Sequence, residues 1–250
     1  MLTSDQRLAY ERDGFVLVND VFKPDEIEIL SAAAGQGKQV MNMPDANGRS
    51  SKLALWTDIS PDVFGLVSTS PRMVGGARAI LGEDVYHWHS KVMMKEPRVG
   101  GAWEWHQDYG YWYNDGCLYP RMISCMLALD DATRENGCLK VLTGSHHLGR
   151  IDHGRRGGQA GADPERVAAI EARLPVYYCQ ARAGSVLFFH GNLLHASEAN
   201  LSDRPRRAFI CCYNALSNAP YGGKGHGKPE PINLAEDGAI LKFATAQTAS

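Results

Sequence analysis

The chain has 250 residues, of which 44% are hydrophobic and 22% are charged, so it is long enough to bury a substantial core. Lys and Arg number 26 against 28 Asp and Glu, and this balance provides no basic field for a nucleic acid or an anionic membrane surface. The sequence has no apolar stretch of about 18 residues, which a membrane-spanning helix needs. We therefore expect a cytoplasmic globular protein that binds neither nucleic acid nor membrane, with its six cysteines reduced.

The first third of the chain is expected to contain three helices and one strand. Residues 4–12 and 24–35 have helical character, the second because Pro24 suits a first helical position and apolar residues recur along one side. Between them, residues 15–18 form a short apolar run rich in strand-forming residues. A third helical segment is expected over about 71–81.

From residue 85 onward, short apolar runs alternate with turn residues. These runs are VYHWHSKVMM, AWEWHQDYGYW, RMISCMLALD, GCLKVL, GSVLFFH and RRAFICCYN. Because Gly, Pro, Asn and Asp separate them, we expect an antiparallel sandwich or barrel. One helix interrupts the series, since Asp163 can cap it, Pro164 can begin it and an amphipathic pattern continues to about Leu174.

The chain is expected to form a single domain over residues 1–250, because no internal repeat and no linker divides it. Its fold class is mainly β with flanking helices. The N-terminal helices are placed at about 4–81 and the β core at about 85–215. The tail, 216–250, is expected to be irregular, with one possible strand at the run AILKFA.

Three side chains could together bind a metal ion. On a strand, residues two apart point to the same face, so His106 and Asp108 could hold one ion between them. His195 follows another strand-like run about 90 residues later and would complete a set of two imidazoles and one carboxylate. Such a set holds non-haem Fe(II) and leaves positions open for a co-substrate and dioxygen. His190 follows the same run and is the alternative third ligand.

Arg206 strengthens this interpretation, since it lies eleven residues after His195 at the start of a strand-like run. An oxygenase of this kind needs a fixed cation for the far carboxylate of a 2-oxo acid, and Arg offers a bidentate fork. On a strand Arg206 shares its face with Ala208 and Ile210, whereas Arg207 points the other way. Small neighbours suit a cation that reaches into a pocket, so we favour Arg206 over Arg207.

These motifs resemble a known family. The triplet HQD at 106–108, the run DDATRENGCLKVLTGSHH, the run HASEAN from His195, and Arg206 are similar to the phytanoyl-CoA dioxygenase family of Fe(II)- and 2-oxoglutarate-dependent oxygenases, over about residues 10–215. The resemblance implies a double-stranded β-helix, which is a distorted, cupin-like jelly roll. It also implies that the His and Asp of the triplet and His195 bind the iron, and that Arg206 anchors 2-oxoglutarate.

The resemblance extends to further residues and to the reaction. It implies that Ser197 assists the anchor, and that His89 and Lys91 approach the co-substrate. Halogenating relatives replace the ligand carboxylate with a small residue, whereas Asp108 is intact. We therefore expect a hydroxylase that uses Fe(II), 2-oxoglutarate and dioxygen on a small-molecule substrate and releases succinate and CO2.

Aromatic residues surround the HQD triplet. Trp103 and Trp105 alternate with His106 along the expected strand, so both should pack away from the metal. Aromatic residues after the triplet could line the mouth of the substrate site, which would suit a small amphipathic molecule or a cation. The candidates are Tyr109, Tyr111 and Trp112.

A metal-binding jelly roll without oxygenase activity is the alternative, either a cupin-like isomerase or a sensor of a 2-oxo acid. His87 and His89 form the HxH pattern of a cupin metal site, but no Glu follows at the short spacing that this interpretation needs. The complete set of iron ligands and the Arg favour the oxygenase.

Overall fold

Two antiparallel sheets lie at the centre of the computed structural model, which describes residues 2–156, 158–223 and 225–248. Within these residues the larger sheet has seven strands and the smaller sheet has four. The larger sheet has the order β1 (Phe15–Val18), β11 (Val186–His190), β6 (Met122–Ala128), β13 (Arg206–Ala215), β4 (Val85–Lys95), β3 (Ser50–Trp56) and β2 (Val40–Pro44). The smaller sheet has the order β10 (Val176–Tyr178), β7 (Leu139–Leu142), β12 (His195–Ser197) and β5 (Trp103–His106).

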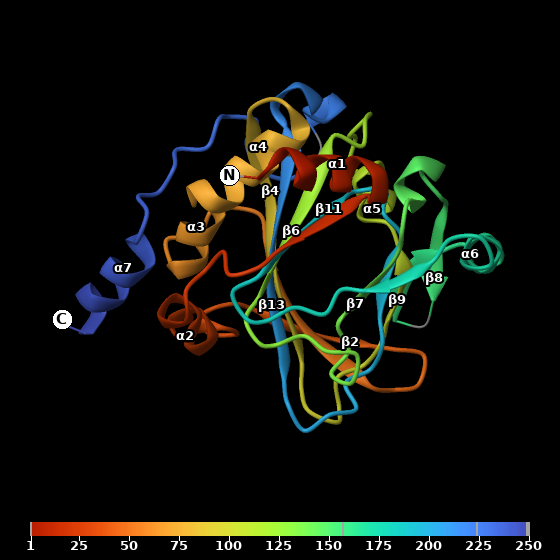
Figure 1. Cartoon of the computed structure of the whole chain (residues 1–250), viewed down its shortest axis with the longest axis horizontal. Helices are drawn as coiled ribbons and strands as arrows, with labels where there is room; N and C mark the ends of the chain where they lie inside the picture. Colours follow the sequence, from red (N-terminus) through yellow and green to blue (C-terminus); the bar gives the residue numbers. More distant parts are fainter. Residues whose placement is uncertain (1, 157, 224, 249–250) are drawn as a thin grey trace.

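Helices cover one side of the larger sheet, and the smaller sheet lies on its other side (Figure 1). A hairpin of β8 (His153–Arg156) and β9 (Gln159–Ala162) extends the second layer through contacts with β5. This arrangement confirms the expected jelly roll with flanking helices. The helices are α1 (Ser4–Asp13), α2 (Pro24–Ala33), α3 (Val63–Ser68), α4 (Pro71–Leu81), α5 (Asp108–Trp112), α6 (Pro164–Glu171) and α7 (Ala239–Thr248).

Local signals account for the helices that were expected, α1, α2, α4 and α6. Thr3 forms a capping box at the start of α1, and Gly14 ends that helix in the left-handed region. Pro24, Pro71 and Pro164 occupy first-turn positions in the other three helices. These four expectations and the strand β1 are confirmed.

The hairpin of β2 and β3 and the helix α7 were not expected. β2 is an exposed edge strand, and it is defined by its pairing with β3 rather than by an alternating pattern of its own. The possible strand at AILKFA is wrong, because this run begins α7. Ile240 and Phe243, three residues apart, both pack against the helix layer, which is the spacing of a helix face.

Strand alternation divides the interior into two cores. On β6, Ile123, Cys125 and Leu127 pack against the helices, whereas Met122 and Met126 face the space between the sheets. Ser124 occupies an inward position between them and is a buried polar residue in this apolar interior. The functional side chains lie in this space between the sheets.

Candidate active site

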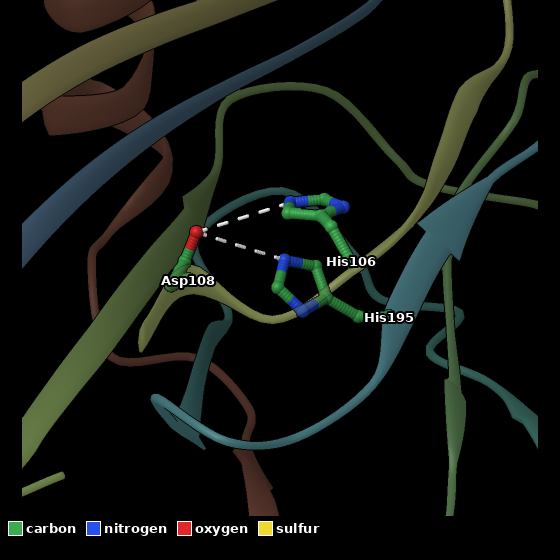
Figure 2. Close-up of side chains that lie close together, drawn as sticks. All are labelled: His106, Asp108 and His195. Carbon is green, nitrogen blue, oxygen red and sulfur yellow. Dashed lines mark ion pairs between the residues drawn. The ribbon is translucent and has the colours of Figure 1, made fainter. Parts of the chain in front are cut away.

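His106, Asp108 and His195 point toward one another between the two sheets (Figure 2). The Nε2 atoms of His106 and His195 lie 3.8 and 3.9 Å from Oδ1 of Asp108. One ligand atom from each residue lies within 4.8 Å of the others, and all three side chains are buried. His190 lies outside this group, and its Nδ1 accepts a hydrogen bond from the backbone of Asn192.

A turn between β5 and α5 brings His106 and Asp108 together. The strand ends at His106, Gln107 has extended geometry, and Asp108 is the first residue of α5. The expectation that both ligands lie on one strand face is therefore wrong, although they do converge. The buried side chain of Gln107 secures this turn, because its amide donates to the carbonyls of Gly149 and Asn192 and accepts from the backbone of Ile151.

Backbone carbonyls orient both imidazoles. Nδ1 of His106 lies 2.8 Å from the carbonyl of Glu104, and Nδ1 of His195 lies 2.9 Å from the carbonyl of Leu193. A carbonyl only accepts, so the hydrogen is on Nδ1 and the lone pair of Nε2 faces the centre of the group. Burial lowers the pKa of both histidines, which keeps the rings neutral and able to bind a metal.

Asp108 is ionised and held from two sides. Burial acts to raise its pKa, but the positive charge of Lys91 and the hydrogen bond from Ser124 help to hold the pKa well below its usual range. Nζ of Lys91 lies 3.6 Å from Oδ1, and Ser124 donates to Oδ2 at 2.5 Å. Two neutral imidazoles and one carboxylate, each fixed by a further hydrogen bond or charge, fit the donor set for Fe(II).

A cavity of about 50 Å³ is lined by His106 and His195 of this group and by Arg206. Arg206 is buried and donates to the carbonyl of Gly137 from Nε and Nη2, at 3.1 and 2.8 Å. Burial lowers its pKa to about 10, so the guanidinium remains charged at neutral pH. Arg207 points to the other face and pairs with Asp130, as strand alternation predicts.

The structure brings some of the expected co-substrate residues together and separates one. Ser197 and Lys91 line the same cavity as Arg206. His89 instead lies next to Trp112, with the ring centroids 6.0 Å apart. His89 does not line the cavity that Ser197, Lys91 and Arg206 share, so it does not belong to this group.

A bulge changes the direction of Trp103. His195 on β12 pairs with His106 on β5. Ser197, two residues after His195, pairs with Trp103, which lies three residues before His106. β5 thus has one extra residue, and such a bulge reverses the alternation of side chains. Trp103 therefore lines the cavity with its ring 6.3 Å from His106, so the expectation that it packs away is wrong. Trp105 packs in a separate apolar cluster, as expected.

The aromatic residues of α5 differ in their surroundings. Tyr109 is buried, and its hydroxyl donates to the carbonyl of Cys117. Tyr111 donates to the carbonyl of Ala160, and its ring lies 5.8 Å from that of His106. Of the three expected substrate residues, Tyr111 thus packs beside a candidate metal ligand, while Trp112 packs against His89.

Comparison with known proteins agrees with this geometry. Residues 10–208 match the family model described as Phytanoyl-CoA dioxygenase. The chain belongs to this family. It is 30% identical to the ectoine dioxygenase of Bordetella bronchiseptica, covering 94% of this chain and 82% of the relative. It is also 30% identical to the L-proline trans-4-hydroxylase of Streptomyces griseoviridis, covering 86% and 88% of the two chains.

Solved structures support the same conclusion. The chain is similar to apo EctD from S. alaskensis, with a TM-score of 0.78 and 26% identity over 94% of this chain and 87% of that one. For EctD with bound Fe, the TM-score is 0.76 and the identity 27%, with the same coverage. This phytanoyl-CoA dioxygenase family member is an Fe(II)- and 2-oxoglutarate-dependent dioxygenase, as its motifs predicted. In the described part of the chain, no helix has both the length and the apolar character to cross a membrane.

Proposed function

We propose that the enzyme hydroxylates a C–H bond of a small organic substrate. One oxygen atom of dioxygen enters the new hydroxyl group and the other enters succinate, while 2-oxoglutarate loses its first carboxylate as CO2. The convergence of three metal-binding atoms beside a cavity that is also lined by a buried guanidinium supports this proposal. When bound, Fe(II) supplies the redox chemistry that lets dioxygen react with the substrate.

The residues of the chain bind and orient the reactants. We assign His106, Asp108 and His195 as the iron ligands, since their donor atoms converge. We assign Arg206, assisted by Ser197, to the far carboxylate of 2-oxoglutarate. In the described chain no carboxylate side chain forms an ion pair with Arg206, so its charge is available to a bound anion.

Lys91 and the apolar wall complete the co-substrate site. Lys91 lines the cavity and carries a positive charge beside Asp108, which favours the binding of an anion next to the metal ligands. Apolar side chains line much of the cavity, and Met126, Phe189 and Ile210 are among them. These apolar side chains exclude water, and charge pairing is stronger in such surroundings.

Anaerobic titration tests this assignment. Addition of Fe(II) and then 2-oxoglutarate to the metal-free protein should produce the weak visible charge-transfer band of a chelated 2-oxo acid. Asp108→Ala should abolish the band. Arg206→Ala should raise the 2-oxoglutarate concentration for half-saturation by at least about 30-fold, because loss of a buried charge partner costs about 2–5 kcal/mol.

Two neighbouring residues provide matched controls. Arg207→Ala removes the adjacent guanidinium, which faces Asp130, and should leave the half-saturation concentration unchanged. His190→Gln alters the competing histidine and should preserve the band. A protein that binds iron but gives no band with 2-oxoglutarate would contradict the proposed function.

A further inference from the structure

A second bulge lies in β4, close to the candidate metal ligands. Cys212 pairs with His89, whereas the next residue, Tyr213, pairs with His87. Trp88 is therefore the additional residue, and the alternation of side chains reverses there. As a result Trp88 and His89 both face the space between the sheets. His87 points away and bonds through Nε2 to the hydroxyl of Ser90.

The two inward-facing residues each carry a polar atom that lacks a partner. Nε1 of Trp88 and Nδ1 of His89 are buried, and neither has a hydrogen-bond partner among the described residues. Trp88 is fully buried and His89 is 5% exposed. A buried polar atom without a partner is costly, and most such atoms in native proteins are satisfied. Two such atoms on consecutive residues indicate a place where a ligand can bind.

The C-terminal segment delivers a third polar ring to this place. The centroid of the His226 ring lies 5.2 Å from that of Trp88 and 6.0 Å from that of His89. Its Nε2 lies 3.9 Å from Oδ2 of Asp115. His226 is half-buried, so a ligand beside it can be reached from solvent.

Two glycines seat this segment on the bulge of β4. Gly225 and Gly227 flank His226, and both have positive φ values, 103° and 70°. A Cβ on Gly225 would lie 2.5 Å from the Trp88 ring, and one on Gly227 would lie 1.9 Å from the carbonyl of His87. Only glycine permits this close approach, which fixes the position of His226.

This group lies on the side of the metal ligands away from Arg206. Along β4 and β13, Lys95 pairs with Arg206, Lys91 pairs with Ile210, and His89 pairs with Cys212. His89 is thus six residue pairs along the ladder from the Arg206 position. Trp112, which packs against His89, belongs to the helix that Asp108 begins. A molecule held here would lie beside the iron without occupying the 2-oxoglutarate cavity.

We propose that His89, His226 and Asp115 recognise the primary substrate, and that this substrate is a small zwitterion. Imidazole N–H groups would donate to its carboxylate, while the Asp115 carboxylate and the Trp112 ring would attract its cationic nitrogen. The inference rests on the proposed function, because it names the substrate class of that site. Ectoine and L-proline, which appear in the names of two relatives, are both small cyclic zwitterions and serve as probes.

Calorimetric titration of the protein with L-proline and with ectoine tests the proposal, in the presence of Fe(II) and 2-oxoglutarate without oxygen. The unaltered protein should bind at least one probe. His226→Ala and His89→Ala should each weaken that binding at least tenfold. His226→Gln, which keeps a donor, should restore part of the affinity. The half-saturation concentration of 2-oxoglutarate, read from the visible band, should stay within twofold throughout.

Two further variants separate recognition from a structural role. Gly227→Ala should lift the segment and weaken probe binding while His226 is retained. Lys228→Ala, at an exposed position just beyond the glycine, should bind as the unaltered protein does. His89→Leu, which keeps most of the buried volume and removes the nitrogen without a partner, should not lower the melting temperature.

Each contrary outcome has a distinct meaning. Failure of the unaltered protein to bind either probe would overturn the zwitterion class. Unchanged probe affinity in the His89 and His226 variants would overturn the subsite. Calorimetry does not depend on the visible band, so absence of the band would contradict the proposed function while the titration still decides this inference.

Discussion

The hydroxyl of Ser124 donates to Oδ2 of Asp108 and leaves Oδ1 facing the two imidazoles. Sequence reasoning missed this residue, because a lone serine within an apolar strand carries no motif. Only the pairing of β6 with β13 and the turn at Gln107 bring it to the carboxylate. The group of metal-binding side chains could be predicted from sequence, since their residue types restrict the chemistry they can perform.

Ser124→Ala should weaken Fe(II) binding by about 10–100-fold, which is the usual cost of losing a hydrogen bond to a metal ligand. Competition with a chromogenic chelator measures this affinity. The matched control is Cys125→Ala on the same strand, since Cys125 faces the helices. Equal iron affinities in the two variants would show that Ser124 does not orient Asp108.

An ion pair joins helix α2 to helix α4 over the outer face of the larger sheet. Arg72 donates to both carboxylate oxygens of Glu26, at 2.8 and 2.7 Å. Glu26 also accepts from the backbone of Lys23 and so completes the capping box of α2. The hydrogen bonds from Arg72 lower the pKa of Glu26 and outweigh the effect of burial.

Glu26→Gln should lower the free energy of unfolding by about 2 kcal/mol at neutral pH, since it weakens charge-assisted hydrogen bonds. A carboxylate with a lowered pKa in the folded state stabilises above its ordinary pKa and loses this contribution as the pH falls. The difference between the two proteins should therefore shrink below about pH 4.5. Urea unfolding at several pH values measures this difference in the free energy of unfolding. The control is Glu28→Gln, at an exposed position of the same helix.

Regular elements were more predictable than departures from regularity. The expected helices have proline or capping residues at their starts, and the faces of β13 follow simple alternation. The bulge in β5 reversed the expected direction of Trp103, and the helix that begins at Asp108 replaced an expected strand. A bulge depends on how two strands pair across the sheet, so a single strand's own sequence does not reveal it.

Ligands should stabilise the whole molecule, since the proposed metal ligands include residues of both β5 and β12 and the proposed co-substrate cavity lies between the two sheets. A ligand at 100 times its dissociation constant adds about 2.7 kcal/mol to the stability of the state that binds it. For a domain of this size, that corresponds to a rise of about 5–11 °C in melting temperature.

Anaerobic differential scanning fluorimetry with Fe(II) and 2-oxoglutarate measures this shift. Asp108→Ala should lose it, whereas Arg207→Ala should retain it. A shift of equal size in Asp108→Ala would mean that these ligands bind elsewhere.

The class of enzyme was predictable from sequence because its chemistry needs particular residues in a particular order. The substrate side of the site was not, because it depends on the C-terminal segment lying against β4. His226 and Asp115 are more than 100 residues apart and belong to no motif. Their proximity follows only from the folded chain.

The bulges make the length of a strand as important as its composition. Deleting Trp88 would restore the two-residue period of β4 and leave His87 and His89 on their present faces, because Tyr213 and Cys212 already pair with them across the bulge. The deletion would remove the inward-facing indole against which Gly225 and the ring of His226 pack. The loss of a single codon would leave all three proposed metal ligands in the sequence and still remove the surface on which the C-terminal segment rests.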